Sequence, residues 1–394
     1  MMFSKRSRLL ICGFYGHHNL GDEAMLAGML CLLKPCLGPD YLSQITVYSN
    51  DPDDTARRHS VATLRNQFPR RRREQWRKWV EHTLALWRHQ YFILGGGDLL
   101  RDSPQREVAT VWLQPLQRAM DLGCQTIVLG ISVGDIWQTE TKAAVVHTLN
   151  QVTLIAVRDR QSQARLQQIG VTCPINVISD LALQAIPTQP VSGTAAAAPK
   201  IGISIRSLAG RLPHLDHAAE QRFYGEMAKI IDYLIERKGA AISLLPFQAY
   251  PPTYVHPPVD DDEKAIAAVL EQTHHRQQIT VHTAFDSVKQ AIDTLRSFDL
   301  VIGTRLHSLI LAGGLGIPLL AVVYDKKVSG FMAEIDQLDN SIAVEQFTLA
   351  TAKPRLDYLL THHQQTRQAI ETAIAGYRQQ IIPVANRLYH LFNS

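Results

Sequence analysis

Arg305 and His307 follow a short apolar segment, Leu300–Ile302, and come just before an apolar helical pattern. Both side chains are therefore expected at the start of a helix, where free backbone N–H groups and the helix dipole already favour an anion. A guanidinium adds bidentate contacts to a carboxylate or a phosphate. The pair predicts a small ligand that carries several negative charges.

Further cationic side chains are expected at the same edge of the same sheet. The strand-like segment Leu319–Val323 leads to Lys326 and Lys327, either of which could reach this edge, and Ile201–Ile205 leads to Arg206. The carboxyl ends of parallel strands meet at one edge of a sheet, where open α/β folds bind their ligands. These residues therefore strengthen the prediction of an anion-binding site.

Arg158 ends another strand-like segment, in the first half of the chain, and is directly followed by Asp159 and a helical pattern. The arginine could contribute to the same anion site. Alternatively, the two side chains form a salt bridge across a helix N-terminus.

A turn of unusual composition, CGFYGHHNLGDEAML over residues 12–26, joins an apolar segment to an apolar helical pattern. Asn19 stands where an N-cap belongs, Asp22 follows three residues later, and Glu23 also falls in the first turn, where negative charge is favourable. Helix capping alone explains these three residues.

Capping does not explain the aromatic and glycine residues of the same turn. Tyr15 and His17 are expected at the carboxyl end of the strand, and Gly13 and Gly16 allow a close backbone approach. The neighbouring carboxylates disfavour a phosphate. The turn therefore predicts a neutral, hydroxyl-rich ligand such as a sugar, with Tyr15 as a stacking face.

Gly95, Gly96 and Gly97 follow a predicted buried strand, Tyr91–Leu94. Three consecutive glycines at a strand end predict a close approach of the backbone to a ligand or to a neighbouring loop.

Strand-like segments alternate with helical patterns on both sides of a proline-rich stretch of small residues. This predicts the α/β class, with two doubly wound, Rossmann-like domains facing a cleft. We expect an N-terminal domain over 1–187, a linker over 188–200 and a C-terminal domain over 201–365. A C-terminal helix follows over 366–394, and Pro383 could let it kink back toward the first domain.

Composition excludes several classes of protein. The net charge of +4 is too small to indicate nucleic-acid binding, and the five cysteines have no metal or redox spacing. The basic and then apolar start does not resemble a signal peptide, and the longest apolar stretch is interrupted by Gly313, Gly314, Gly316 and Pro318. We therefore expect a cytoplasmic protein without a membrane span.

Motifs spread over residues 8–330 resemble those of the polysaccharide pyruvyl transferases. The motifs are Asn19-Leu20-Gly21-Asp22-Glu23-Ala24, Gly95-Gly96-Gly97, Arg158-Asp159, Ser179-Asp180-Leu181-Ala182-Leu183, Gly202-Ile203-Ser204-Ile205-Arg206, Leu245-Pro246-Phe247-Gln248, Gly303-Thr304-Arg305-Leu306-His307-Ser308 and Tyr324-Asp325-x-Lys327-Val328. They stand in the order that the family shows. The chain departs from the family pattern at Asp98, Lys326 and a long loop over Tyr250–Asp262.

The resemblance implies a fold similar to the two-domain (GT-B type) glycosyltransferases, phosphoenolpyruvate as the donor, no obligatory metal or cofactor, and a ketal formed on two hydroxyls of a sugar. The implied donor-binding residues are Arg158, Arg206, Arg305, His307 and Lys327. The implied catalytic residues are His307 as the acid, Arg305, and Asp22 as the group that orients or deprotonates the acceptor. The implied acceptor-binding residues are Tyr15, His17, Asn19, Asp22 and Gln248, which places the acceptor on the N-terminal domain and the donor on the C-terminal domain.

Two alternatives share the predicted fold. A glycosyltransferase that uses a nucleotide-sugar would also need a cationic diphosphate site, although no ribose-binding carboxylate stands out beyond Glu334 and Asp336. A non-catalytic protein that binds sugar phosphates would need the same pocket without the acid.

A predicted helix over 70–87 has one aromatic face and a basic start. The face comprises Trp76, Trp79, Val80, Thr83, Leu84 and Trp87, and the basic cluster comprises Arg70–Arg73, Arg77 and Lys78. Such a helix could pack its tryptophans on the first domain. It could instead lie on an anionic membrane at the inner face, which would suit a lipid-linked saccharide acceptor.

Chelation tests the expected independence of metal. The His, Cys, Asp and Glu residues lack the spacing of metal ligands, and the predicted cations already neutralise the donor. We therefore expect full pyruvyl transfer in excess EDTA. Activity that is lost and then restored only by Mg²⁺ would favour the nucleotide-sugar alternative.

Overall fold

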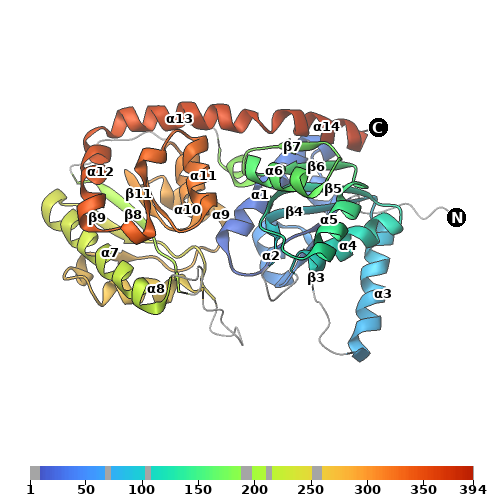
Figure 1. The fold of residues 1–394 in the computed structure, drawn as a ribbon, viewed down its shortest axis with the longest axis horizontal. Helices are drawn as coiled ribbons and strands as arrows, with labels where there is room; N and C mark the ends of the chain where they lie inside the picture. Colours follow the sequence, from blue (N-terminus) through green and yellow to red (C-terminus); the bar gives the residue numbers. More distant parts are fainter. Residues whose placement is uncertain are drawn as a thin grey trace. The chain divides into compact units, whose positions relative to one another are not determined.

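The computed structural model describes residues 9–66, 72–102, 108–187, 198–209, 215–250 and 260–393, with the backbone alone over 72–79. The chain divides into two compact units (Figure 1). The first comprises residues 1–17, 22–185 and 378–394, and the second comprises 18–21 and 186–377. Most of the predicted linker, 188–197, lies outside the described residues.

The first unit is built on a parallel seven-stranded sheet in the order β3-β2-β1-β4-β5-β6-β7. Its strands are β1 (Leu9–Cys12), β2 (Ile45–Ser49), β3 (Ala62–Arg65), β4 (Tyr91–Leu100), β5 (Gln125–Val133), β6 (Leu154–Val157) and β7 (Ile175–Val177). The helices of this part of the chain are α1 (Leu20–Leu37), α2 (Pro52–His59), α3 (Arg72–Arg88), α4 (Ala109–Asp121), α5 (Thr139–Leu149), α6 (Arg160–Ile169) and the C-terminal α14 (Ile382–Asn393). The central strands are mostly buried, as β1 shows with four buried residues, because helices cover both faces of a parallel sheet.

The three consecutive glycines at 95–97 lie within a strand, which corrects the prediction that the strand ends before them. β4 continues through Gly95, Gly96 and Gly97 to Leu100, and Gly96 and Gly97 have positive φ angles of 72° and 88°. A Cβ on Gly95 would lie 2.3 Å from Cε of Met29 in α1. The glycines therefore let α1 and the turn before it pack closely on β4. Of the two predicted reasons for the glycines, a ligand or a neighbouring loop, the structure shows close packing of neighbouring segments.

The C-terminal helical segment ends on the first unit. The predicted single helix is two, α13 (His363–Gln379) and α14, and Pro383 lies in the first turn of α14. The Tyr91 hydroxyl donates to the Leu391 carbonyl at 2.8 Å, and the rings of Tyr91 and Phe392 lie 4.6 Å apart. These contacts attach α14 to the start of β4.

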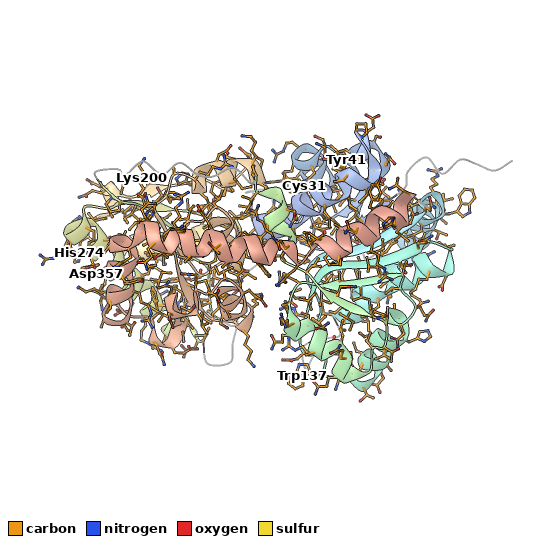
Figure 2. The ribbon with its side chains drawn as sticks, turned by 90° about the horizontal axis from the view of Figure 1, so that it is seen from above. Cys31, Tyr41, Trp137, Lys200, His274 and Asp357 are labelled. Carbon is orange, nitrogen blue, oxygen red and sulfur yellow. The ribbon has the colours of Figure 1, made fainter. Side chains whose placement is uncertain are left out.

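The second unit has a parallel six-stranded sheet in the order β10-β9-β8-β11-β12-β13. Its strands are β8 (Lys200–Ser204), β9 (Ala241–Leu244), β10 (Thr280–Val281), β11 (Leu300–Gly303), β12 (Leu319–Val323) and β13 (Ser341–Ala343). Its helices are α7 (His217–Lys238), α8 (Asp262–Leu270), α9 (Val288–Leu295), α10 (Leu306–Gly314), α11 (Lys326–Glu334), α12 (Leu349–Thr361) and most of α13. Asp357, labelled in Figure 2, ties α12 to α7 by accepting from the Tyr233 hydroxyl and pairing with Lys238.

Gly28 offers a test of the packing of α1. A Cβ at this position would lie 1.7 Å from the Leu181 carbonyl oxygen, and backbone cannot move aside as a side chain can. We expect Gly28→Ala to lower the free energy of unfolding, measured in urea, by about 3 kcal/mol. The control Gly330→Ala, in α11, meets no described atom within 4 Å and should raise stability by about 0.5 kcal/mol. Equal unfolding curves for the two variants would contradict this packing.

Candidate anion-binding and acid site

The scaffold of the site is the pairing of β8 with β11 in the second unit. Gly303 is in register with Ser204, and Thr304 donates to the Ser204 carbonyl from its backbone N–H at 3.0 Å and from its hydroxyl at 3.1 Å. The two strands therefore end together. Arg206 and Arg305, each two residues beyond its strand, leave the sheet at the same edge.

Arg305 occupies the N-cap position of α10 in an extended conformation. The Ser308 hydroxyl donates to its carbonyl at 2.6 Å and fixes this helix start. The Arg305 side chain is only 7% exposed. The predicted helix-start position of the arginine is thus the one observed.

Acidic and amide side chains surround the Arg305 guanidinium. Asp262 accepts from Nε at 3.0 Å and from Nη2 at 2.5 Å, Asp260 accepts from Nη2 at 2.8 Å, and the Gln248 amide oxygen accepts from Nη1 at 2.8 Å. Burial alone would lower the pKa of Arg305, but Asp262 and Asp260 outweigh burial and raise it. The side chain is therefore a permanent cation.

Asp262 also organises the backbone around this arginine. It is completely buried and begins α8, and its carboxylate accepts from the backbone N–H groups of Phe247 at 2.9 Å and Gln248 at 3.0 Å. The sequence analysis missed Asp260 and Asp262 as site residues, although they end the long acidic loop that departs from the family pattern. Residues 251–259 of that loop lie outside the described chain.

Arg206 joins the same cluster from β8. Its Nη2 donates to Asp260 at 2.7 Å, its Nη1 donates to the Tyr324 hydroxyl, and the guanidinium carbon lies 4.7 Å from the Tyr324 ring centre. Burial would raise the pKa of Tyr324, but Lys327, Arg206 and Arg305 lower it overall. The potential at the Tyr324 hydroxyl is therefore positive, as an anion site requires.

Lys327 lies beside this positive region at the start of α11. Asp325 caps the helix by accepting from the Lys327 N–H at 3.0 Å, and the Lys327 ammonium lies 3.9 Å from the same carboxylate. The ammonium group is part of a half-exposed side chain, whereas Lys326 is exposed. Of the two predicted lysines, Lys327 is therefore the one that acts on Tyr324.

His307 packs against a glycine from the start of α1. A Cβ on Gly21 would lie 2.2 Å from Nδ1 of His307, so only glycine permits this contact. Residues 18–21 belong to the second unit: Leu20 N–H donates to the Phe247 carbonyl at 2.8 Å, and Asn19 pairs with Gln248 in an antiparallel bridge. Asn19 and Gln248, two predicted acceptor residues, are thus brought together.

Tyr15 does not provide the predicted stacking face, which is a correction. Its ring is completely buried, and its hydroxyl donates to the Gly95 carbonyl at 2.5 Å. Phe14, which the sequence analysis missed, is 36% exposed and stacks on His17 with ring centres 3.7 Å apart. The neighbouring position therefore supplies the accessible aromatic ring.

The rest of the predicted acceptor turn is fixed by backbone packing. A Cβ on Gly13 would lie 2.2 Å from the Gly95 carbonyl oxygen, and a Cβ on Gly16 would lie 2.2 Å from the Ser49 hydroxyl. Glu23 is buried and accepts from the Gly16 N–H at 2.9 Å, while its other oxygen lies 2.7 Å from Nε2 of His59. Asp22 is 6% exposed and follows directly after Gly21.

Arg158, the predicted donor residue of the first unit, is buried and pairs with Asp180 at 3.2 Å. Asp159 caps α6 by accepting from the Ser162 N–H at 2.7 Å. The predicted alternative of an Arg158–Asp159 salt bridge is therefore replaced by two separate interactions.

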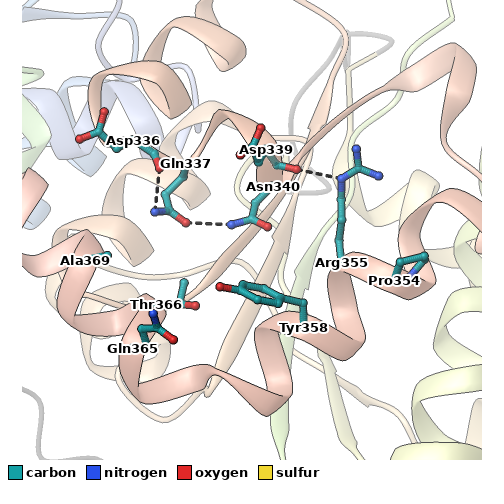
Figure 3. A pocket seen from close by; sticks show the side chains of 10 residues that line it. All are labelled: Asp336, Gln337, Asp339, Asn340, Pro354, Arg355, Tyr358, Gln365, Thr366 and Ala369. Atoms are coloured by element: carbon teal, nitrogen blue, oxygen red, sulfur yellow. Dashed lines mark hydrogen bonds between the residues drawn. The ribbon is translucent and has the colours of Figure 1, made fainter.

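A groove of about 540 Å³ lies at the other end of α11 (Figure 3). Asp336, Asp339, Tyr358 and Gln365 are among the residues that line it, and Arg355 donates to the Asp339 carbonyl at 2.8 Å. α11 starts at the cationic edge and runs back along the sheet, so the groove is separate from the arginine cluster.

The described residues show neither a metal centre nor a membrane span. No three His, Cys, Asp or Glu side chains gather there in a way that could hold a metal ion. Within the same residues, no helix has both the length and the apolar composition to cross a bilayer.

Solved structures share this architecture over nearly the whole chain. A putative UDP-N-acetylglucosamine 2-epimerase from Listeria monocytogenes is 12% identical, with a TM-score of 0.57 and coverage of 97% of this chain and 94% of that one. A UDP-GlcNAc 2-epimerase from Neisseria meningitidis is 11% identical, with a TM-score of 0.56 and coverage of 96% and 99%. A trehalose-6-phosphate synthase is 10% identical, with a TM-score of 0.53 and coverage of 97% and 99%. The fold is thus that of the GT-B class, with two Rossmann-like domains.

The family is narrower than this fold class. The model of the polysaccharide pyruvyl transferase family matches residues 19–326, and the chain belongs to that family. The matched range contains Asn19, Arg158, Arg206, Arg305 and His307. A search of curated proteins found no match.

Gly21 gives a direct test of how His307 is positioned. We expect Gly21→Ala to displace the imidazole and to lower kcat about a hundredfold, because a shift of about 1 Å at a reacting group has this effect. The thermal unfolding midpoint should change little, since the His307 side chain can move. Gly376→Ala, whose Cβ meets no described atom within 4 Å, is the control. Unchanged kcat in Gly21→Ala would show that this contact does not position His307 for turnover.

Proposed function

We propose that the protein transfers pyruvate from phosphoenolpyruvate onto two hydroxyls of a saccharide, forms a ketal and releases phosphate. The observation that carries the proposal is the convergence of Arg206 and Arg305 at one sheet edge, with His307 in the first turn of the same helix N-terminus. This arrangement provides anion binding and a proton donor together, and the family match supports a transferase that acts on polysaccharide.

The charge of the proposed donor suits this site. Phosphoenolpyruvate carries roughly −2.5 to −3, from a carboxylate and a phosphate whose second ionisation is near pH 6. Two guanidiniums can hold carboxylate and phosphate oxygens in a bidentate manner, and the N-terminus of α10 adds its dipole. We assign Arg206, Arg305 and Lys327 to the donor, with Arg158 as a further donor ligand.

His307 is the proposed general acid. A proton from the imidazolium adds to the methylene carbon of the donor, and the π electrons of the double bond form the new C–H bond. A saccharide hydroxyl then attacks the cationic central carbon and loses its proton. Cleavage of the C–O bond releases phosphate with its electron pair and leaves an oxocarbenium carbon, and a second hydroxyl adds to this carbon and loses its proton to close the ketal.

The proposed acceptor residues are His17, Asn19, Asp22 and Gln248, and Phe14 takes the stacking role first assigned to Tyr15. Asn19 and Gln248 are held by their mutual backbone bridge, and Phe14 by its stacking on His17. Asp22 would orient or deprotonate the attacking hydroxyl. Fixed polar groups and an accessible aromatic ring are the kinds of side chain that bind a saccharide.

Substitution of His307 tests the proposed acid. We expect His307→Gln to reduce kcat by a factor of about 100 to 1,000, because general acid catalysis contributes effects of this size. The measurement is the rate at which phosphate is released from phosphoenolpyruvate in the presence of saccharide. His274→Gln, on an imidazole that is 84% exposed, is the control and should retain full turnover. A His307→Gln protein that is folded and fully active would refute the assignment.

α3 is the proposed membrane-contacting element, and part of its predicted apolar face is exposed. Leu84 and Trp87 are 45% and 54% exposed, whereas Ala85 and Leu86 are buried, so the helix does not pack Trp87 on the first unit. Trp76, Trp79 and the basic side chains at the start of the helix lie outside the described side chains. We propose that this exposed apolar edge holds the protein on the anionic inner face of the membrane, near a lipid-linked acceptor.

Vesicle binding tests this role of α3. Each basic residue near an anionic surface contributes about 1 kcal/mol, so replacing Arg72 and Arg73 by glutamine should reduce co-sedimentation with phosphatidylserine vesicles about tenfold or more at low salt. Trp87→Ala should reduce it further. Equal sedimentation of these variants and the unmodified protein would remove the membrane role and leave the pyruvyl transfer proposal intact.

A further inference from the structure

One carboxylate lies between the two arginines that we assign to the donor. Asp260 accepts from Nη2 of Arg206 at 2.7 Å through one oxygen and from Nη2 of Arg305 at 2.8 Å through the other. Nη1 of Arg305 also donates, at 3.2 Å, to the Asp260 oxygen that Arg206 contacts. An acidic side chain of the protein therefore takes up donors that an anionic ligand would need.

The Arg305 guanidinium has an acceptor at each of its nitrogens. Nε contacts Asp262, Nη1 contacts Gln248 and Asp260, and Nη2 contacts both carboxylates. A ligand that makes a bidentate contact with Arg305 must therefore replace one of these partners. It must also approach a site that already holds two negative charges, which repel an incoming phosphate.

The two carboxylates differ in how firmly they are held. Asp262 is fully buried and also accepts from the N–H groups of Phe247 and Gln248, so its removal would leave those groups without an acceptor. The Asp260 side chain is 15% exposed and precedes the first residue of α8 by two positions. Asp260 is therefore the partner that can leave Arg305 at the smaller cost.

We propose that Asp260 is an internal competitor which the anionic donor displaces from Arg206 and Arg305. The inference rests on the proposed function in assigning these arginines to phosphoenolpyruvate. A carboxylate attached to the same chain acts at a high effective concentration, so a ligand with one carboxylate competes with it poorly. A ligand with a phosphate and a carboxylate offers more charge to both guanidiniums and replaces it. Asp260 thereby selects a multiply charged donor over monoanions such as pyruvate.

Calorimetric titration of the full chain with phosphoenolpyruvate, inorganic phosphate and pyruvate tests this competition. We expect Asp260→Asn, which keeps the shape and removes the charge, to bind phosphoenolpyruvate and phosphate about tenfold or more tightly and to gain measurable binding of pyruvate. Asp293→Asn, at a 46% exposed carboxylate that pairs with Lys289 on α9, is the matched control and should leave the binding of all three anions unchanged. Asp260→Ser provides a second charge-free variant should the asparagine variant prove unstable.

The outcomes separate this inference from the proposed function. Equal or weaker binding of phosphate and phosphoenolpyruvate by both Asp260 variants, in folded proteins, would overturn the competitor role even if the unmodified enzyme binds phosphoenolpyruvate well. Tighter phosphate binding by the Asp260 variants without any binding of phosphoenolpyruvate would support the competitor role and refute the proposed donor. Tighter binding of both anions, with pyruvate gained, supports both.

Discussion

The buried ion pair between Arg305 and Asp262 is the interaction on which the second unit's functional edge depends. It joins the start of α10 to the start of α8, and Asp262 extends the connection to the backbone of Phe247 and Gln248. That backbone in turn holds Asn19 and Leu20. Loss of Arg305 would leave a fully buried carboxylate without its cation, which costs about 3–5 kcal/mol, so Arg305→Ala would disturb the fold as well as the chemistry. This is why His307, held against Gly21, is the better position at which to examine the reaction.

The cluster combines permanent charge with a displaceable counter-charge. Arg206 and Arg305 remain cations whatever the pH in the working range, and together with Lys327 they lower the pKa of Tyr324 despite its burial. Asp260 and Asp262 neutralise two of these charges within the protein. In the absence of a ligand, the two carboxylates stabilise the buried arginines. The site still binds a ligand whose charge exceeds that of one carboxylate.

The sequence predicted the parts of the fold and site that depend on local pattern. Apolar segments that alternate with helical ones indicated both parallel sheets, and the strand-to-helix turn placed Arg305 at the first residue before α10. The partners of Arg305 could not be predicted, because Asp260 and Asp262 approach it from a segment more than 40 positions away, and a sequence does not state which charges pair. Tyr15 and Phe14 are neighbours of similar type, and only packing against Gly95 decides which ring is buried. The periodicity of α3 left packing and membrane contact both open, because it fits either equally well, and only the structure shows that Leu84 and Trp87 are exposed.

The central claim is that this edge binds phosphoenolpyruvate rather than a nucleotide-sugar, and calorimetric comparison of the two ligands tests it most directly. Titration of the unmodified full chain with phosphoenolpyruvate should give a saturable heat that decreases strongly with salt, because arginine contacts to an anion dominate. UDP-N-acetylglucosamine, titrated under the same conditions, should give no saturable heat and should not displace phosphoenolpyruvate. Saturable binding of the nucleotide-sugar with no heat from phosphoenolpyruvate would contradict the account and identify the protein as a nucleotide-sugar-binding member of the GT-B fold.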